Sequence, residues 1–135
     1  MNRNKLFLTL AITVLSGCLL AQESPTTPKT ARVRITQGPE IELAKQHLTI
    51  IRWTTNNPGG SPVHYGIVHY GTDPNDLSQT AKSPIRLNPD HSSTVFRVRI
   101  DNLKPRTTYY YTVDSVEANG ASDRFVSPTN TFITP

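Results

Sequence analysis

The sequence predicts an all-β protein, a two-sheet antiparallel β-sandwich of about seven strands. From Ala31 onward, apolar and polar residues alternate with a period of two, and turn residues recur about every eight to twelve positions. The 135 residues suit one domain, and 36% hydrophobic with 18% charged residues is an ordinary globular composition. The nine residues Leu103 to Tyr111 add a specific corner between two strands.

The sequence pattern of this corner is a leucine, a proline, a threonine and a tyrosine at every second position, namely Leu103, Pro105, Thr107 and Tyr109. In sandwiches of the immunoglobulin type, such a tyrosine bonds back to the backbone a few residues upstream and forms a tyrosine corner. We therefore expect Leu103 to close one end of the core, Pro105 to fix the turn, and the Tyr109 hydroxyl to bond to the turn.

Alternation and turn residues place the strands. The only tryptophan, Trp53, is expected in the core, because a sandwich needs a bulky ring between its sheets. The Gly38-Pro39 pair is expected to end the first strand, and Ser83 to His91, with two prolines, to be irregular. The expected strands are Arg32–Thr36, Leu48–Thr54, Val63–Gly71, a short edge strand Leu77–Ala81, Ser93–Ile100, Tyr109–Asp114 and Phe125–Ile133.

The N-terminus has the pattern of an export signal. Two basic residues precede the apolar run Leu6 to Leu15, which is too short to span a bilayer as a helix. The following Leu-Ser-Gly-Cys resembles a bacterial lipobox, which implies cleavage before Cys18 and a lipid on that cysteine. The alternative is cleavage after Ala21. Residues 1–17 are thus expected to be a signal peptide, 18–30 a Pro/Thr linker, and 31–135 the folded domain.

Cysteine content and charge limit the function classes. Cys18 is the only cysteine, so the folded domain has no disulfide and its stability must come from packing. The chain carries 14 basic and 10 acidic residues, and cleavage removes two basic ones, so the mature net charge is about +2 instead of +4. So small a charge does not indicate nucleic-acid binding.

Two resemblances follow from these residues. Trp53, Tyr70 and the corner series make residues 31–135 similar to a fibronectin type III domain. Within that class, Val68-His69-Tyr70-Gly71-Thr72-Asp73-Pro74 and the closing Thr131-Phe132-Ile133-Thr134-Pro135 resemble the N-terminal β-sandwich domain of purple acid phosphatases. The resemblance implies no catalytic residue, because in those enzymes the metal-binding motifs lie in a catalytic domain that would begin beyond Pro135.

The residues themselves predict no enzyme, no metal site and no cofactor. None of the four histidines follows a glycine, as the first histidine of that family's Gly-His-x-His motif does. His64 and His69 are five residues apart on one strand, so they are expected on opposite faces of a sheet, where they cannot share an ion. No serine lies in a Gly-x-Ser-x-Gly segment, and no cysteine follows Cys18.

One surface suggests a binding function. In a fibronectin-type sandwich, the first, second and fifth strands share a sheet, so their outward residues share a face. That face, which we call the arginine face, is expected to show Arg32, Arg34, Arg52, Arg97 and Arg99 and no outward acid. Like charges opposite one another destabilise a sheet by roughly 0.2–1 kcal/mol per pair. The cluster thus indicates either a partner surface or arginine stems that keep an apolar face soluble.

The sequence therefore predicts a non-catalytic binding or scaffolding module of the cell envelope, or a secreted or periplasmic one. Its expected partners are a protein or an anionic polysaccharide. A lipid on Cys18 is also expected to anchor the chain to a membrane. One alternative is a detached accessory domain of a purple acid phosphatase-like enzyme. Another is a carbohydrate-binding module that uses the outward Tyr110.

Overall fold

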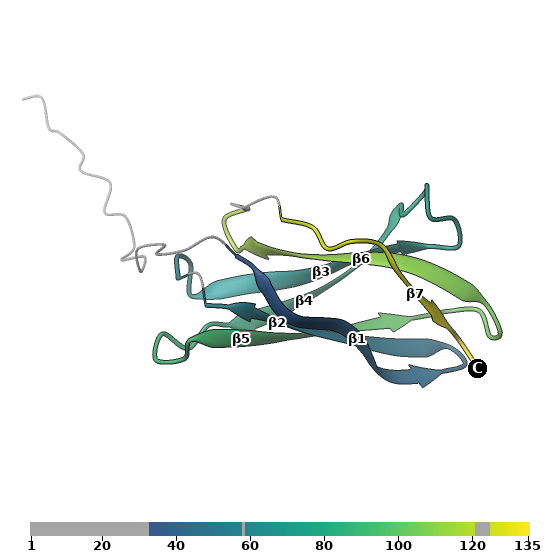
Figure 1. Cartoon of the computed structure of the whole chain (residues 1–135), viewed down its shortest axis with the longest axis horizontal. Coiled ribbons are helices and arrows are strands. Elements are labelled where there is room, and N and C mark those ends of the chain that lie inside the picture. The colour runs from purple at the N-terminus through teal and green to yellow at the C-terminus, as the bar shows by residue number, and fades with distance from the viewer. Residues whose placement is uncertain (1–32, 58, 121–124) are drawn as a thin grey trace, which may run out of the picture.

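The computed structural model describes residues 33–57, 59–120 and 125–135 and contains seven strands in these ranges (Figure 1). The expected signal peptide, the linker, Cys18 and Arg32 lie outside the described residues. The strands are β1 (Ile35–Lys45), β2 (Leu48–Asn56), β3 (Val63–Gly71), β4 (Gln79–Arg86), β5 (Ser93–Asp101), β6 (Thr108–Glu117) and β7 (Asn130–Ile133).

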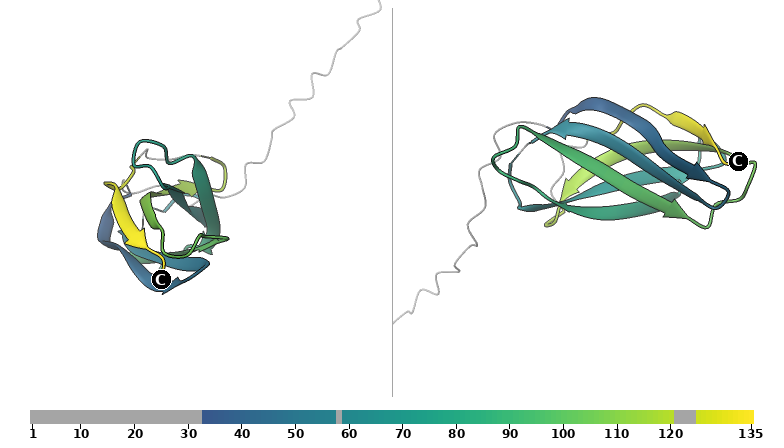
Figure 2. Two further views of the ribbon diagram at one scale, coloured as in Figure 1. Left: turned by 90° about the vertical axis from the view of Figure 1, so that its right-hand side faces the viewer. Right: turned by 90° about the horizontal axis from the view of Figure 1, so that it is seen from below.

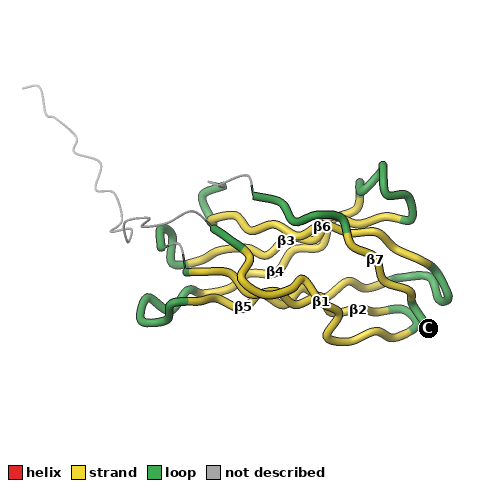
Figure 3. The backbone as a smooth tube through the Cα atoms, viewed as in Figure 1, coloured by secondary structure: helices red, strands yellow, loops and turns green. Residues whose placement is uncertain are grey.

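The strands form two antiparallel sheets, one in the order β1-β2-β5 and the other in the order β4-β3-β6-β7. Figure 2 shows the two sheets facing each other, and Figure 3 shows that loops join the strands at the two ends of the sandwich. This arrangement confirms the predicted two-sheet sandwich and the grouping of the first, second and fifth strands.

The core lies between the sheets and follows the predicted alternation. Trp53 stacks on Phe96 with ring centroids 5.2 Å apart, and Tyr109 stacks on Phe132 at 5.3 Å. The buried cluster consists of Ile51, Trp53, Val68, Tyr70, Phe96, Val98, Ile100, Leu103, Tyr109, Tyr111, Val113 and Phe132. The inward orientation of Trp53 and Tyr70 is therefore confirmed.

The prediction that the first strand ends at Gly38-Pro39 is wrong. Strand β1 continues to Lys45, with three shifts in its register against β2 before Leu43. It is an edge strand, so only one of its sides needs backbone hydrogen bonds. A proline and irregular residues are tolerated there because the unpaired side faces away from the sheet.

The position at a sheet edge also explains why β4 differs from the prediction, a short strand Leu77–Ala81 followed by an irregular segment. The strand instead covers Gln79–Arg86 and pairs with β3 throughout, including Pro84 opposite Tyr65. It is the outer strand of its sheet. A proline on an outer strand is therefore a poor indicator of a strand end.

The last strand is shorter than predicted. Only Asn130–Ile133 pairs regularly with β6, although Val126 forms an isolated bridge with Asp114. The Val113 amide donates to the Ser127 hydroxyl at 2.9 Å, so a side chain takes the place of a ladder carbonyl. Pro128 follows without an amide hydrogen, and regular pairing begins after it.

Candidate functional site

The tyrosine corner has the geometry that the sequence predicts. Leu103 is buried, and the Lys104 amide donates to the Tyr109 hydroxyl at 2.9 Å. The Thr107 hydroxyl donates to the Pro105 carbonyl at 2.9 Å, which closes the turn on itself. The corner links the two sheets and fixes one end of the sandwich.

The C-terminal segment is fastened to this corner by Thr134, whose side chain is buried. Its hydroxyl donates to the Lys104 carbonyl at 2.6 Å and accepts the Thr107 amide at 3.0 Å. The Arg106 amide donates to the Pro135 carbonyl at 3.2 Å. The final residues are therefore held against the corner by side-chain and backbone bonds.

Arg52, Arg97 and Arg99 of the predicted arginine face lie outward on β2 and β5, but the expected lack of acids on this face is wrong. Arg52 and Arg97 are register partners across β2 and β5, and both point outward. The extension of β1 brings two glutamates beside them. Arg52 contacts Glu40 at 2.7 Å, and Arg97 contacts Glu42 at 2.8 Å.

The other described arginines of this face differ from one another. Arg99 pairs with Asp101 on its own strand at 2.7 Å. Arg34 precedes β1 and is exposed, and its backbone amide donates to the Asn56 side chain at 2.6 Å. The strands of the arginine face thus carry three carboxylates beside Arg52, Arg97 and Arg99, so their charges balance.

The histidines form no metal site in the described part of the chain, where no three His, Cys, Asp or Glu side chains gather. His64 is buried between the sheets, while His69 lies on the outer face of β3, so the predicted separation of these two residues is confirmed. His69 Nε2 lies 3.4 Å from Asp114 Oδ2. The Nδ1 atom of His47 bonds to the Leu103 carbonyl at 3.0 Å.

Tyr110 lies half-buried on the outer face of β6, on the side opposite its core neighbours. Another tyrosine of this outer face, Tyr65 on β3, has the Lys82 ammonium 4.0 Å from its ring centroid. The pairing of β3 with β6 sets Tyr65 opposite Val116 and Tyr110 opposite Gly71, six positions away along the strand, so the two tyrosines do not form one aromatic platform.

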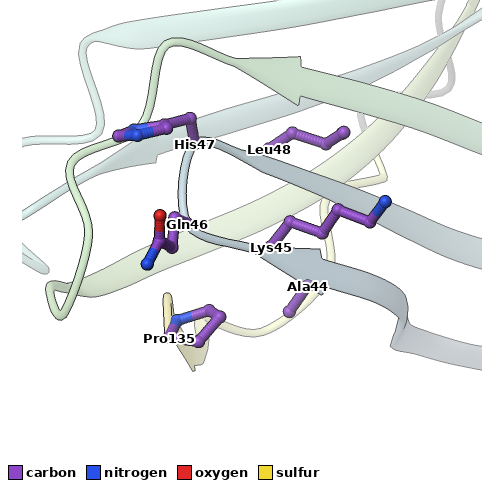
Figure 4. Close-up of a pocket in the computed structure, with 6 residues that line it drawn as sticks. All are labelled: Ala44, Lys45, Gln46, His47, Leu48 and Pro135. Carbon is purple, nitrogen blue, oxygen red and sulfur yellow. The ribbon is translucent and has the colours of Figure 1, made fainter.

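A shallow hollow of about 520 Å³ lies at the end of the sandwich that contains the corner. It is lined by the β1–β2 turn, Ala44 to Leu48, and by Pro135 (Figure 4). The sequence alone does not indicate this hollow, because its walls come from segments almost 90 positions apart that only the fold brings together. No local pattern in either segment indicates the other.

Comparison with known proteins gives a family. Residues 36–134 match the model described as purple acid phosphatase, N-terminal domain. No curated protein is significantly similar to the chain. None of the described residues forms a helix that could cross a membrane.

Solved structures share the fold. Three of them are the sensor domain of the anti-sigma factor RsgI4 from Pseudobacteroides cellulosolvens. One has a TM-score of 0.52 at 21% identity, covering 76% of this chain and 88% of that chain. A solution structure also gives 0.52 at 21%, covering 78% and 75%, and a third gives 0.53 at 22%, covering 77% and 95%.

Proposed function

Because the chain belongs to the purple acid phosphatase N-terminal domain family, we propose that it is a non-catalytic binding or scaffolding module of the bacterial cell envelope. The observation that carries this proposal is the family match itself, which covers residues 36–134 and is to the accessory domain, not the catalytic one. Among the described residues, no three metal-ligating side chains lie close enough together to hold an ion.

The arginine face is one candidate contact surface of this module. Three of its arginines, Arg52, Arg97 and Arg99, form ion pairs with Glu40, Glu42 and Asp101. Pairs of this kind on a surface are weak, and a partner can exchange them for its own charged groups. The face therefore suits a protein surface of mixed charge better than a polyanion, which would meet the three carboxylates.

The first test is for hydrolysis by the purified chain. Phosphate release from p-nitrophenyl phosphate is measured with and without added iron or zinc, and a purified purple acid phosphatase serves as the positive control. We expect no release above the rate in buffer. Saturable release that copurifies with the protein would show that the chain is an enzyme and would end the proposal.

A second candidate function is that of an accessory chain to a separate metallophosphatase, which the family match specifically favours. Its test is coexpression with a metallophosphatase catalytic domain encoded by the same organism. A complex that survives gel filtration and changes the turnover of the catalytic chain would favour this function. Independent elution with unchanged turnover would favour the self-standing module.

The proposed envelope location rests on Cys18 and the apolar run before it. We expect the expressed chain to incorporate labelled palmitate and to partition into detergent, and a Cys18→Ala variant to do neither. If the wild-type chain is recovered unlabelled from the soluble fraction with Gln22 as its first residue, cleavage occurs after Ala21 and there is no lipid anchor.

A further inference from the structure

One end of the sandwich combines features that the proposed function does not yet use. We call it the distal pole and define it as the turn Ala44–Leu48, the corner Asn102–Thr107, and Pro135. Backbone bonds hold its three parts together: the Leu103 amide donates to the His47 carbonyl at 3.1 Å, and the Arg106 amide to the Pro135 carbonyl at 3.2 Å. Figure 1 shows that the described chain begins at the opposite end of the sandwich.

The cations of the distal pole lack carboxylate partners. Lys45, Lys104 and Arg106 are exposed, and none forms an ion pair with a described residue. The arginine face provides the contrast, because Arg52, Arg97 and Arg99 each have a carboxylate within 2.8 Å. The chain thus neutralises the cations on its flat sheet face and leaves those at the distal pole available to a ligand.

The acidic side chains at this end of the molecule do not cancel that charge. Asp101 is held by Arg99 at 2.7 Å. Asp73 and Asp76 pair through their backbones in the loop between β3 and β4, at the edge of the four-stranded sheet farthest from β7. The hollow lies on the other side of the pole, between the β1–β2 turn and the chain after β7.

Arg106 is held in an unusual backbone conformation, with a φ of 50°. Glycine adopts this left-handed region without steric cost, whereas a residue with a Cβ atom is strained there. The fold alone therefore favours glycine at position 106. The arginine side chain at this position is more easily explained by an interaction than by stability.

Apolar atoms lie beside these cations. Ala44, Leu48 and Pro135 line the hollow, and Ile133, two residues before Pro135, is 67% exposed on the edge strand β7. Figure 4 shows the Gln46 side chain on the side of the turn where Pro135 lies, with the His47 ring pointing away from it. A hollow of about 520 Å³ accommodates an apolar side chain.

The backbone of the neighbouring edge strand is also accessible. Three register shifts interrupt β1 before Leu43, but Leu43, Ala44 and Lys45 pair regularly with β2. An edge strand has one row of unpaired amide and carbonyl groups, to which an extended peptide can add. Only this last regular stretch of β1 adjoins the hollow.

We propose that the distal pole binds an extended acidic segment of a partner protein. Carboxylates of that segment pair with Lys45, Lys104 and Arg106, and one apolar side chain enters the hollow between Ala44, Leu48 and Pro135. This inference deepens the proposed function, on which it rests, by naming a surface and a partner class. An anionic polysaccharide matches the charge but offers no apolar side chain and no backbone amides for the edge of β1.

The test uses the ¹⁵N-labelled full chain and a defined probe, the peptide acetyl-Glu-Glu-Leu-Glu-Glu-amide. We expect saturable chemical-shift changes at Ala44–Leu48 and Lys104–Thr107, weakened by salt because the contacts are ionic. A peptide with glutamine for every glutamate, and one with serine for leucine, should bind more weakly. Polygalacturonate, a polyanion without apolar side chains, is the third probe.

The matched variants separate the pole from the arginine face. Arg106→Gly relieves the backbone strain, so it should unfold at no lower urea concentration than the wild type. Combined with Lys45→Ser, it should weaken peptide binding by about tenfold. Arg97→Ser with Arg99→Ser removes the same charge from the arginine face and should leave peptide binding within about twofold of the wild type.

Three results would overturn the inference: no saturable shift at the pole, equal binding of polygalacturonate, or loss of binding only in the arginine-face variant. None of these touches the proposal of a non-catalytic module, which depends on the hydrolysis assay. Phosphate release by the purified chain would end the module proposal even if the peptide binds at the pole. The two failures are therefore distinguishable.

Discussion

At the residue scale, the Thr134 side chain makes two hydrogen bonds that hold the C-terminal segment against the corner. Its side chain is 1% exposed and satisfies two backbone groups of the corner, the Lys104 carbonyl and the Thr107 amide. Its own amide donates to the Thr107 carbonyl at 3.1 Å. A single hydroxyl thus joins the end of β7 to the loop between β5 and β6.

Replacing Thr134 by valine keeps the shape and removes the hydroxyl. We expect the free energy of unfolding to fall by about 1–3 kcal/mol, because two backbone groups lose a partner in a nearly buried site. Urea denaturation measures the loss. Thr131→Val, at an exposed position of the same strand, is the control and should change stability by less than about 0.5 kcal/mol.

Gly66 is a second residue with a clear packing role. A Cβ atom there would lie 2.8 Å from Phe96 Cδ1 and 3.0 Å from Trp53 Cη2. These two rings stack at the centre of the core, with 14° between their planes. The absence of a side chain at position 66 makes room for the stack.

We expect Gly66→Ala to lower the free energy of unfolding by about 1–3 kcal/mol through overpacking. Phenylalanine at position 53 would lack the Trp53 atoms that the new methyl group meets. The cost of Gly66→Ala should therefore be smaller in a Trp53→Phe background than in the wild type. Strictly additive effects in this cycle, measured by denaturation, would contradict the packing explanation.

At the scale of elements, the extension of β1 changes the character of the sheet β1-β2-β5. Arg52 and Arg97 lie directly opposite each other across β2 and β5. Glu42 of β1 reaches both, at 2.8 Å from Arg97 and 3.8 Å from Arg52. An irregular edge strand thus supplies the charge that makes the two arginines compatible.

Glu42→Gln should leave this arginine pair without the carboxylate they share. We expect a loss of about 0.5–1 kcal/mol in unfolding free energy at low salt, and a smaller loss at high salt because exposed charges are screened. In an Arg97→Gln background, the same change should cost little. An equal cost in both backgrounds would show that Glu42 acts through packing instead of charge.

At the scale of the whole molecule, two core tyrosines, Tyr70 and Tyr111, make the stability of the fold depend on alkaline pH. Burial raises the pKa of Tyr111 to about 12, from 10.0 in an exposed tyrosine. The pKa of Tyr70 is also raised, first by burial and then by the nearby Tyr109 and Asp101. In both cases the folded state favours the neutral phenol.

The sign of the pH effect follows from these directions. Below pH 10 the phenols are neutral in both states, so their full contribution to stability is present. Above pH 10 the unfolded chain loses these protons more readily, so stability falls as the pH rises toward about 12. We expect a shallower fall for Tyr111→Phe in urea denaturation at several pH values, and an unchanged fall would exclude Tyr111 as a cause.

The sequence by itself determined the all-β class, the core alternation and the corner. These features are local, since a period of two fixes which residues share a face, and the spacing of Leu103, Pro105 and Tyr109 fixes one turn. Trp53 and Tyr70 were placed correctly for the same reason. Family membership also followed from short segments, now matched over residues 36–134.

Only the tertiary structure decided what happens at the edges and the end of the sandwich. Pro39 and Pro84 look like strand ends, yet both lie in edge strands, where a missing amide hydrogen need not be replaced. Whether carboxylates accompany the arginines depended on the continuation of β1 past Pro39, which places Glu42 beside Arg97. Lys45 and Pro135 line one hollow, and Arg106 bonds to Pro135, because the fold joins segments that are distant in the sequence. A local pattern carries no information about such contacts.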